Sequence, residues 1–298
     1  MELTKVNGNT YYIPGSTNIG VFQFKDRYTL LIDTGDNNQQ ARKICATLNE
    51  NKMNIKYVLN THEHVDHSGG NLFICENYPG SIFHASPTAK LFMENDYLFP
   101  LYLYGGNPIS ELSRHFTKNK NFTVDIELAP GEMKINDEKF EIIPLAGHAA
   151  GQIGIATRDQ VCFLGDALFS EEIIDKYSFP FLYDIETQFK TLDNISQLDY
   201  DHFVVAHAAR IYQLEEIRSL VELNRENLEK YLSLVLDLLE QPKSREELLE
   251  EIIILQDLTP DFKEYYFLLS TTGAMISYLY KKDLLKFQQE NGKVFFYK

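Results

Sequence analysis

The composition of the chain limits its partners. It has 298 residues, with 28 Lys and Arg against 43 Asp and Glu, a formal net charge of -15 and a pI near 5.0. Nucleic acid and anionic lipid bind clustered cationic side chains, so this charge disfavours both as partners of the chain as a whole. The hydrophobic content of 44% is enough for a large buried core and excludes global disorder. We therefore expect a folded protein that acts on small molecules.

The chain carries no targeting or membrane signal that the sequence reveals. Residues 1–10 contain neither the basic nor the apolar region of a signal peptide, and no window approaches about eighteen uninterrupted apolar residues. These features predict a cytoplasmic protein that does not span a membrane. Three cysteines, Cys45, Cys75 and Cys162, lie far apart and form no CxxC pair. A disulfide framework and a thiolate zinc finger are therefore not expected.

The first part of the chain predicts alternating strands and helices. Short apolar runs rich in β-branched and aromatic residues favour strands at 18–24, 28–35 and 56–61, and the segment 41–52 has helical spacing. A second β-rich stretch runs from about residue 122 to 169. This alternation predicts an α/β sandwich.

The last third of the chain has a mainly helical pattern. A long amphipathic helix is predicted at 211–240, where Gln241-Pro242 ends it. Ser244 and Glu247 have the spacing of a capping box, which predicts the start of a second helix. A third helix is predicted at 264–282.

The order of these elements predicts the domain organisation. The end of the chain reads as a hairpin around Asn291-Gly292. Helix, helix, helix, hairpin is the order of a winged helix. We therefore predict a catalytic domain at 1–210, with an insertion at 85–128, and a helical linker plus winged-helix-like domain at 211–298.

The segment 61–70, THEHVDHSGG, contains the strongest local pattern in the chain. Four residues of metal-binding type form the order His-x-His-x-Asp-His: His62, His64, Asp66 and His67. Alternate residues at a strand end can point to one place, whereas Asp66 and His67, on a first helical turn, can point to a second. Packing gives no reason for these side chains to coincide, so the segment predicts a metal site.

Three further ligand candidates each follow an apolar run. His148 stands in LAGHAAGQIG, Asp166 in FLGDALF and His207 in VVAHAAR. A loop after a strand would present each of these side chains. A carboxylate that a buried strand delivers into a glycine-containing turn is costly unless a cation lies beside it. We therefore group these three residues with the segment 61–70.

Five motifs, in the order LLIDTG, THEHVDHSGG, GHAAGQIG, FLGDALF and VVAHAAR, resemble those of the metallo-β-lactamase superfamily of binuclear metallohydrolases. The resemblance covers about residues 1–210 and extends to glyoxalase II-like members that append a winged helix. It implies a four-layer αβ/βα sandwich. It also implies site roles: one metal bound by His62, His64 and His148, a second by Asp66, His67 and His207, a bridging Asp166, and Asp33 as a buried carboxylate that supports the ligands.

The implied ligand set suits hydrolytic chemistry. Imidazole and carboxylate without thiolate favour Zn, with Fe or Mn as alternatives. Two divalent ions that share a carboxylate can share a water, whose lowered pKa makes a bridging hydroxide available near neutral pH. Asp66 is the candidate for holding or relaying the proton. Because GDALF resembles thioesterase members, we predict hydrolysis of a small-molecule acyl bond in a thioester, ester or lactone.

A phosphodiesterase or ribonuclease that uses the same metals is the alternative. The predicted winged helix and the segment 281–298, with five Lys against two acidic residues, favour it. The apolar character of Ile276 and Leu279 in the third helix favours packing or a homodimer contact instead. A redox diiron site is disfavoured because position 64 is His rather than Glu. A non-catalytic scaffold is disfavoured because every expected ligand is present.

The segment 85–128 is rich in aromatic residues and is predicted to fold as a lid. Two interpretations stay open: the rings line a substrate pocket, or they bury the lid or a dimer contact. Tyr102 and Tyr104 are candidates for substrate contacts, as is Phe169, where acyl-homoserine lactonases that resemble this layout carry a tyrosine. Three other histidines lack such a context and are predicted to be ordinary surface or core residues: His84, His115 and His202.

Overall fold

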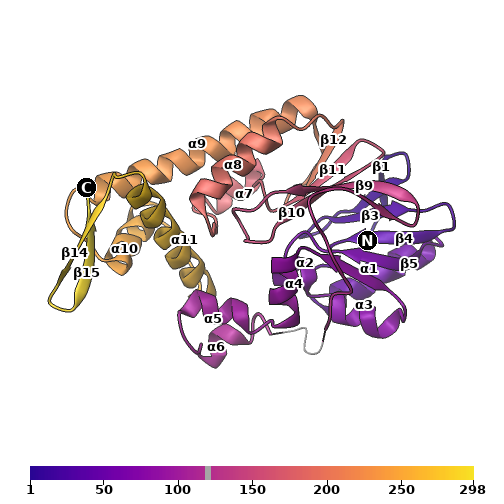
Figure 1. The fold of residues 1–298 in the computed structure, drawn as a ribbon, viewed down its shortest axis with the longest axis horizontal. Helices are drawn as coiled ribbons and strands as arrows, with labels where there is room; N and C mark the ends of the chain where they lie inside the picture. The colour runs from indigo at the N-terminus through magenta and orange to yellow at the C-terminus, as the bar shows by residue number, and fades with distance from the viewer. Residues whose placement is uncertain (118–121) are drawn as a thin grey trace.

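A computed structural model of the chain describes residues 1–117 and 122–298. Residues 118–121, which belong to the predicted lid segment 85–128, lie outside the described residues. The described residues contain two large β-sheets that face each other, with helices on the outer face of each sheet (Figure 1). The predicted α/β sandwich is confirmed.

The first sheet has seven strands in the order of the sequence. Its first four strands pair antiparallel and its last four pair parallel, so the sheet changes character at the fourth strand. The strands are β1 (Thr4–Asn7), β2 (Thr10–Ile13), β3 (Ile19–Gln23), β4 (Tyr28–Ile32), β5 (Asn54–Leu59), β6 (Ile82–Ala85) and β7 (Ile126–Glu127).

The second sheet has six strands in the order β13-β12-β11-β10-β9-β8. All of its neighbours pair antiparallel except β11 and β12, which are parallel and are therefore joined by a helical crossover. The strands are β8 (Gly131–Ile135), β9 (Glu138–Pro144), β10 (Ile153–Thr157), β11 (Val161–Gly165), β12 (His202–Val205) and β13 (Tyr212–Gln213).

Side chains that point alternately to the two faces of each sheet build the four layers. In β4, Leu31 packs into the core under the helices of the first sheet, whereas Leu30 and Ile32 pack between the two sheets. The helices over the first sheet are α1 (Asn38–Glu50), α3 (Asn71–Asn77) and α4 (Pro87–Glu94). Over the second sheet lie α8 (Ile185–Ser196) and the first half of α9 (Leu214–Leu238). The central strands of each sheet, such as β3 and β4 in the first and β10 and β11 in the second, are thereby buried on both faces.

Short helices connect the layers at one edge of the sandwich. They are α2 (Val65–Ser68), α5 (Leu98–Tyr104), α6 (Ser110–Ser113) and α7 (Glu171–Lys176). The helix α5 ends at Gly105, whose φ of 75° is a left-handed conformation that glycine adopts without strain. This edge carries the predicted lid segment.

The C-terminal part of the chain has the predicted order of helices and hairpin. After α9 come α10 (Arg245–Leu255), α11 (Phe262–Lys281) and the hairpin of β14 (Lys286–Glu290) and β15 (Lys293–Tyr297). The capping box of Ser244 and Glu247 is present at the start of α10. The helix α9 begins at Leu214, three residues later than predicted, because Tyr212 and Gln213 first pair with β12.

The C-terminal helices share an apolar core with the sandwich. One apolar core contains Leu248 and Leu249 of α10 and Met275 of α11 together with Phe179 and Ile185 of the preceding domain. Figure 1 shows α9 running from the sandwich into this region. The domain boundary near residue 210, the winged-helix description and the cytoplasmic location stay predictions. Among the described helices, none combines the length and the apolar character needed to cross a membrane.

Candidate metal centre

The seven predicted ligands come together where strands of the two sheets end. His62 and His64 lie between β5 and α2, and α2 contains Asp66 and His67. The other three lie in loops that follow strands of the second sheet: His148 after β9, Asp166 after β11 and His207 after β12. Gly69 follows the last residue of α2. It lies so close to the loop after β4 that a Cβ atom added to it would be 2.1 Å from the backbone oxygen of Asp36.

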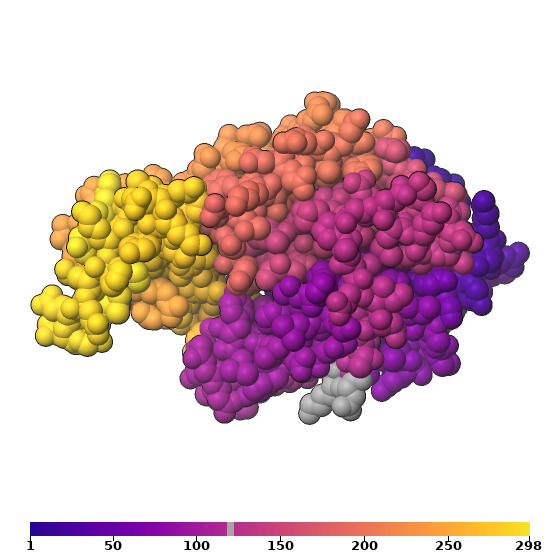
Figure 2. Space-filling model, viewed as in Figure 1, coloured from indigo at the N-terminus to yellow at the C-terminus, as the bar shows by residue number. Residues whose placement is uncertain are grey.

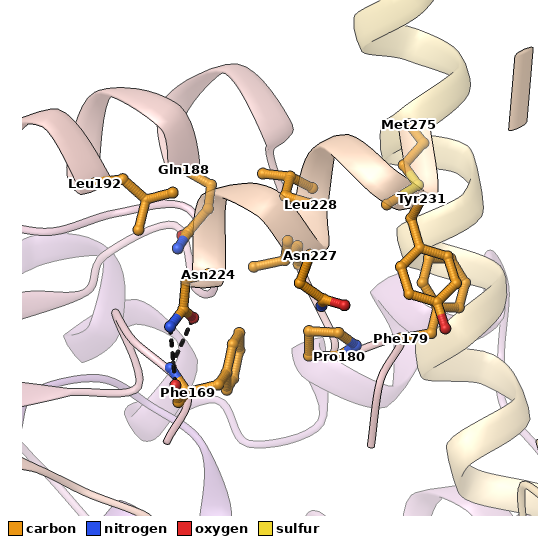
Figure 3. A pocket seen from close by; sticks show the side chains of 11 residues that line it. Phe169, Phe179, Pro180, Gln188, Leu192, Asn224, Asn227, Leu228, Tyr231 and Met275 are labelled. Carbon is orange, nitrogen blue, oxygen red and sulfur yellow. Dashed lines mark hydrogen bonds between the residues drawn. The ribbon is translucent and has the colours of Figure 1, made fainter. Parts of the chain in front are cut away.

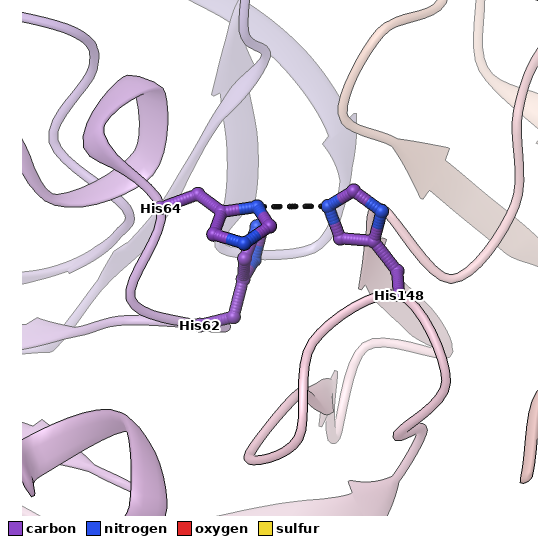
Figure 4. A group of neighbouring side chains, drawn as sticks. All are labelled: His62, His64 and His148. Atoms are coloured by element: carbon purple, nitrogen blue, oxygen red, sulfur yellow. Dashed lines mark hydrogen bonds between the residues drawn. The ribbon is translucent and has the colours of Figure 1, made fainter. Parts of the chain in front are cut away.

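The first group of ligand candidates consists of His62, His64 and His148. One ring nitrogen from each lies within 4.8 Å of the others, and His64 Nδ1 is 2.9 Å from His148 Nε2 (Figure 4). Burial lowers the pKa of all three, and the neighbouring imidazoles lower those of His62 and His64 further. The three rings are therefore neutral, which is the form that coordinates a cation.

Two atoms of this group are unsatisfied. Nε2 of His62 and Nε2 of His64 are buried and have no hydrogen-bond partner among the described residues. Buried polar atoms are almost always hydrogen-bonded, so two unsatisfied nitrogens beside each other need a ligand. Three neutral imidazoles fit a divalent transition metal. Nothing in the donor set disagrees with the predicted Zn.

The second group consists of Asp66, His67, Asp166 and His207, each with one ligand atom within 4.8 Å of the others. Asp66 Oδ2 lies 3.5 Å from His67 Nε2 and 3.1 Å from His207 Nε2. Burial alone would lower the pKa of His67 and of His207, but the nearby carboxylates outweigh it and raise both, that of His207 to about 11. The carboxylates of this group therefore favour positive charge at its centre, which a divalent cation would supply.

Asp166, a member of the second group, also lies close to the first. Its Oδ1 is 3.2 Å from His67 Nε2, and its Oδ2 is 3.3 Å from His207 Nε2 and 3.5 Å from His148 Nε2. Burial would raise the pKa of this carboxyl, but His207 and His67 hold it well below its usual range. A buried carboxylate with oxygens near both groups is suited to bridge two cations.

Asp33 supports the site from behind the ligands. Its Oδ2 accepts hydrogen bonds from His67 Nδ1 and Thr61 Oγ1, each at 2.8 Å, and its Oδ1 accepts one from Thr61 N at 2.8 Å. Thr61 Oγ1 is also 3.0 Å from His62 Nδ1. One buried carboxylate thus orients a histidine of each group and fixes which nitrogen faces the centre.

Two residues that the sequence did not single out hold the His207 loop. The Asn18 amide donates to the carbonyl oxygens of Val205 at 3.0 Å and Ala208 at 2.8 Å, which flank His207. His207 Nδ1 donates to the Ser16 carbonyl at 2.6 Å. Asn18 is 5% exposed. The sequence offered one signal for this role of Asn18, which is that a polar residue stands at the start of the predicted strand 18–24.

A cavity of about 500 Å³ opens beside the two groups. His64, Asp66, His148 and Asp166 line one part of it, and aromatic rings line much of the rest. Phe99 and Phe116 come from the segment 85–128, and two more rings, which the sequence did not single out, are Phe181 and Phe267. Rings of the segment 85–128 therefore line part of the cavity, whereas its use as a substrate pocket and the description of 85–128 as a lid stay predictions.

The predicted pocket residues Tyr102 and Tyr104 do not line this cavity. Tyr102 Oη is 3.1 Å from Ser270 Oγ, and the Tyr104 ring is 5.5 Å from that of Tyr266, so both contact α11. Burial raises the pKa of Tyr102 to about 12. These two side chains attach α5 to the C-terminal helix instead of facing the ligands.

Phe169 also lies beside the site without lining the cavity. Its ring is 5.8 Å from that of His148, and its backbone N and O are bonded to the Asn224 amide of α9 at 2.9 Å each (Figure 3). It borders a void of about 20 Å³ between α8, α9 and α11. Phe169 therefore packs the interface of the sandwich with the C-terminal helices.

Three cavity residues with polar side chains were missed by sequence reasoning. His115, predicted to be ordinary, lines the cavity together with Asp36, in the loop after β4, and Lys263 of α11. The other two histidines are as predicted: His84 is buried with Nδ1 3.1 Å from the Val58 oxygen, and His202 lies on β12 beside Gln213. No local pattern distinguishes His115 or Lys263, because the fold brings them to the site.

The four-layer sandwich with its two His and Asp groups at one edge is the arrangement of a metallo-β-lactamase-type protein. The sequence model of the metallo-beta-lactamase superfamily matches residues 12–207, which is more than half of the chain. The chain belongs to this superfamily, and its relatives place it near glyoxalase II.

Curated relatives are hydroxyacylglutathione hydrolases. That of Haemophilus ducreyi is 26% identical over 188 residues, 63% of this chain and 66% of the relative. That of Vibrio cholerae is 28% identical over 152 residues, 51% of this chain and 47% of the relative. The chain thus covers less than two thirds of the length of these relatives.

Solved structures share the fold over the whole chain. A metallo-beta-lactamase family protein from Thermus thermophilus has a TM-score of 0.76 at 20% identity and covers 97% of this chain and 99% of its own. A beta-lactamase domain protein from Burkholderia ambifaria has a TM-score of 0.76 at 15% identity and covers 99% and 93%. These likenesses concern the fold, including its C-terminal helices.

Proposed function

We propose that this protein is a binuclear metal-dependent hydrolase of a small-molecule acyl bond, in a thioester, ester or lactone. The observation that carries the proposal is the position of Asp166, whose two oxygens lie within 3.5 Å of histidines from both groups. A single buried carboxylate in that position suits two cations close together. The family and the donor set support the same conclusion.

The residues that would hold the metals follow from the two groups. One ion, most simply Zn, would be bound by His62, His64 and His148, and the second by Asp66, His67 and His207, with Asp166 between them. Two divalent cations bound there would lower the pKa of a water molecule enough for hydroxide, the nucleophile, to form near neutral pH, and would polarise the substrate carbonyl. To admit them, His67 and His207 release the protons that their neighbouring carboxylates stabilise.

The side chains of the site then have separate tasks. Asp33 holds His67 directly and His62 through Thr61, so the ligands are preorganised. The Asp66 side chain is 37% exposed, unlike the buried Asp166, and so has access to both the centre and the cavity. Asp66 is therefore the carboxylate that takes the proton of the attacking water and passes it to the leaving group or to solvent.

The cavity supports an acyl substrate. Rings of Phe99 and Phe181 lie 4.8 and 5.6 Å from the His64 ring, so an apolar group next to the reacting carbonyl would be enclosed. Exclusion of water from this side strengthens the electrostatic contacts at the reacting atoms. The hydroxyacylglutathione hydrolases to which the chain is similar are named for the hydrolysis of a thioester, which supports the same reaction class.

The test is turnover of a panel of thioesters, esters and lactones by protein reconstituted with two equivalents of Zn, Mn or Fe. His64→Gln should lose metal and activity together, whereas His202→Gln, the same substitution at a histidine on β12 away from the centre, should keep both. Failure to hydrolyse any acyl substrate at full metal occupancy contradicts the proposal. Cleavage of a phosphodiester or of RNA in that case would establish the alternative reaction.

A further inference from the structure

The helix α11 supplies part of the cavity wall, although it begins 55 residues after the last metal-ligand candidate in the sequence. A series of aromatic contacts leads from the ligands to this helix. The His148 and Phe181 ring centroids are 5.5 Å apart, those of Phe181 and Phe267 are 5.0 Å apart, and the Lys263 Nζ is 6.0 Å from the Phe267 centroid. The cavity therefore has the metal ligands at one end and a lysine beyond the rings.

Contacts between α5 and α11 fix this wall. The Phe99 ring lies 6.1 Å from that of Phe267, and Tyr102 and Tyr104 contact Ser270 and Tyr266 of α11. Figure 2 shows the residues of the insertion bordering the C-terminal helices on this face of the molecule. Because several contacts hold the two helices together, the position of Lys263 relative to the ligands is set by the fold.

Lys263 is the one Lys or Arg among the described residues that line the cavity. It is half-buried and makes no ion pair with any described residue. The acidic neighbours on its own helix have other partners, since Asp261 and Glu264 each accept a hydrogen bond from the other's backbone N–H at the start of α11. Three carboxylates line the cavity, and all of them belong to the catalytic domain. They are Asp66 and Asp166 among the ligands and Asp36 in the loop after β4.

Lys263 is thus a half-buried cation in a cavity wall, in a protein whose net charge is -15. Stacking over Phe267 contributes little to its stability, and partial burial weakens its contact with water. The apolar rings around it lower the local dielectric constant, which strengthens the attraction of an anion placed there. His115, on the same cavity lining, adds imidazole nitrogens that can donate a hydrogen bond to such an anion.

We propose that Lys263, assisted by His115, binds an anionic group at the far end of the substrate, while the Phe99, Phe181 and Phe267 rings hold an apolar stretch between that group and the reacting carbonyl. The substrate class is thus an acyl ester or thioester with an apolar middle and a terminal carboxylate or phosphate. This inference rests on the proposed acyl hydrolysis but concerns selectivity, so the two can fail separately.

The experiment compares charged and neutral substrates of matched length on the metal-loaded protein. The charged set is the para-nitrophenyl monoesters of adipic and sebacic acid, and the neutral set is the para-nitrophenyl esters of heptanoic and undecanoic acid. A third set replaces the terminal carboxylate by a phosphate monoester and distinguishes the two anions. The quantity measured is the ratio of kcat/KM for the charged ester to kcat/KM for the neutral ester of the same length.

For at least one chain length we expect this ratio to be about tenfold higher in the wild type than in Lys263→Met, which keeps the apolar stem but removes the charge. The ratio should also fall in high salt. Lys281→Met, at the exposed end of the same helix, is the control and should keep the wild-type ratio. Equal ratios in the wild type and Lys263→Met overturn the inference and leave the proposed function intact.

Binding of the product acids gives a readout that does not need turnover. Calorimetry should find that the wild type binds the dicarboxylate adipate or sebacate more tightly than the monocarboxylate of the same length. In Lys263→Met the ratio of these two affinities should be about tenfold lower. If neither dicarboxylate is preferred, or if Lys263→Met keeps the preference, Lys263 is not an anion site. If no ester is hydrolysed but the preference is present, the binding inference stands and acyl hydrolysis fails.

Discussion

The buried carboxylate of Asp33 gives the sharpest test of how the centre is built, through the substitution Asp33→Asn. Asp33 has a φ of 67°, a left-handed conformation that Asn adopts as readily as Asp, so the backbone is not strained by this change. The Asn carbonyl can still accept the bond from Thr61 N. Its amide NH₂ group, however, is a donor, and it replaces the oxygen that accepts from His67 Nδ1 and Thr61 Oγ1.

The expected magnitude follows from those two lost hydrogen bonds. Loss of the carboxylate partner of a metal-binding histidine reduces metal affinity by about 10 to 100-fold, or about 1.4 to 2.7 kcal/mol. His67 loses its partner directly, whereas His62 is affected only through Thr61, so the second metal should be weakened more than the first. In the metal-free protein the free energy of unfolding should fall by about 2 kcal/mol, because a buried donor is left without an acceptor.

The assay is competitive titration of Zn or Mn against a chromophoric chelator, combined with urea unfolding of the metal-free protein. Asp137→Asn is a matched control, because Asp137 has a φ of 65° in the exposed turn between β8 and β9. It should leave both measurements within experimental error of the wild type. Wild-type affinity for both metals in Asp33→Asn, or a loss equal to that in Asp137→Asn, would refute the supporting role of Asp33.

Four further predictions concern the bridge, the His207 loop and the thiols. Asp166→Ala should weaken both metals, because its oxygens face both groups; elemental analysis that finds two metals retained contradicts this. Asn18→Ala should lower the free energy of unfolding by about 2 kcal/mol and weaken the second metal, as measured by urea unfolding and chelator titration; an unchanged stability argues against the clamp. A thiol reagent should modify Cys75 in the native protein, and Cys45 and Cys162 only after unfolding. Burial raises the pKa of the Cys45 thiol from 9.0 to about 11, so the folded state binds this proton more tightly than the unfolded state does. The contribution of the Cys45 proton to the free energy of unfolding should therefore hold below pH 9 and decline from pH 9 to about 11. In Cys45→Ala this decline should be absent.

The secondary structure of the sandwich was predictable because its signals are local. The apolar runs at 18–24 and 28–35 contain β3 and β4, and the run at 56–61 overlaps the last four residues of β5, since strands buried on both faces need little polar alternation. Caps specified helix starts equally well, as the reciprocal bonds of Ser244 and Glu247 at α10 illustrate. The start of α9 was misplaced because β-pairing of Tyr212 and Gln213 with β12 depends on a partner strand that the local sequence does not reveal.

The aromatic residues of the segment 85–128 mark the limit of sequence reasoning. Tyr102 and Tyr104 were candidates for the pocket, but they contact α11, whereas Phe99 lines the cavity beside His64. All three lie on the short helix α5, and their sequence spacing gives no indication of how that helix is rotated about its axis. The rotation is set by the packing of α5 against α11.

The sequence by itself indicated which side chains come together, because a buried carboxylate is costly without a cation beside it and packing gives no reason for a compact His and Asp cluster. His62, His64 and Asp166 were identifiable without knowing where the strands lie. The tertiary structure decided what surrounds them, because cavity walls are built from segments that are distant in the chain. Lys263 and Phe267 line the cavity only because α9 carries the chain back so that α11 packs against α5 and the catalytic edge.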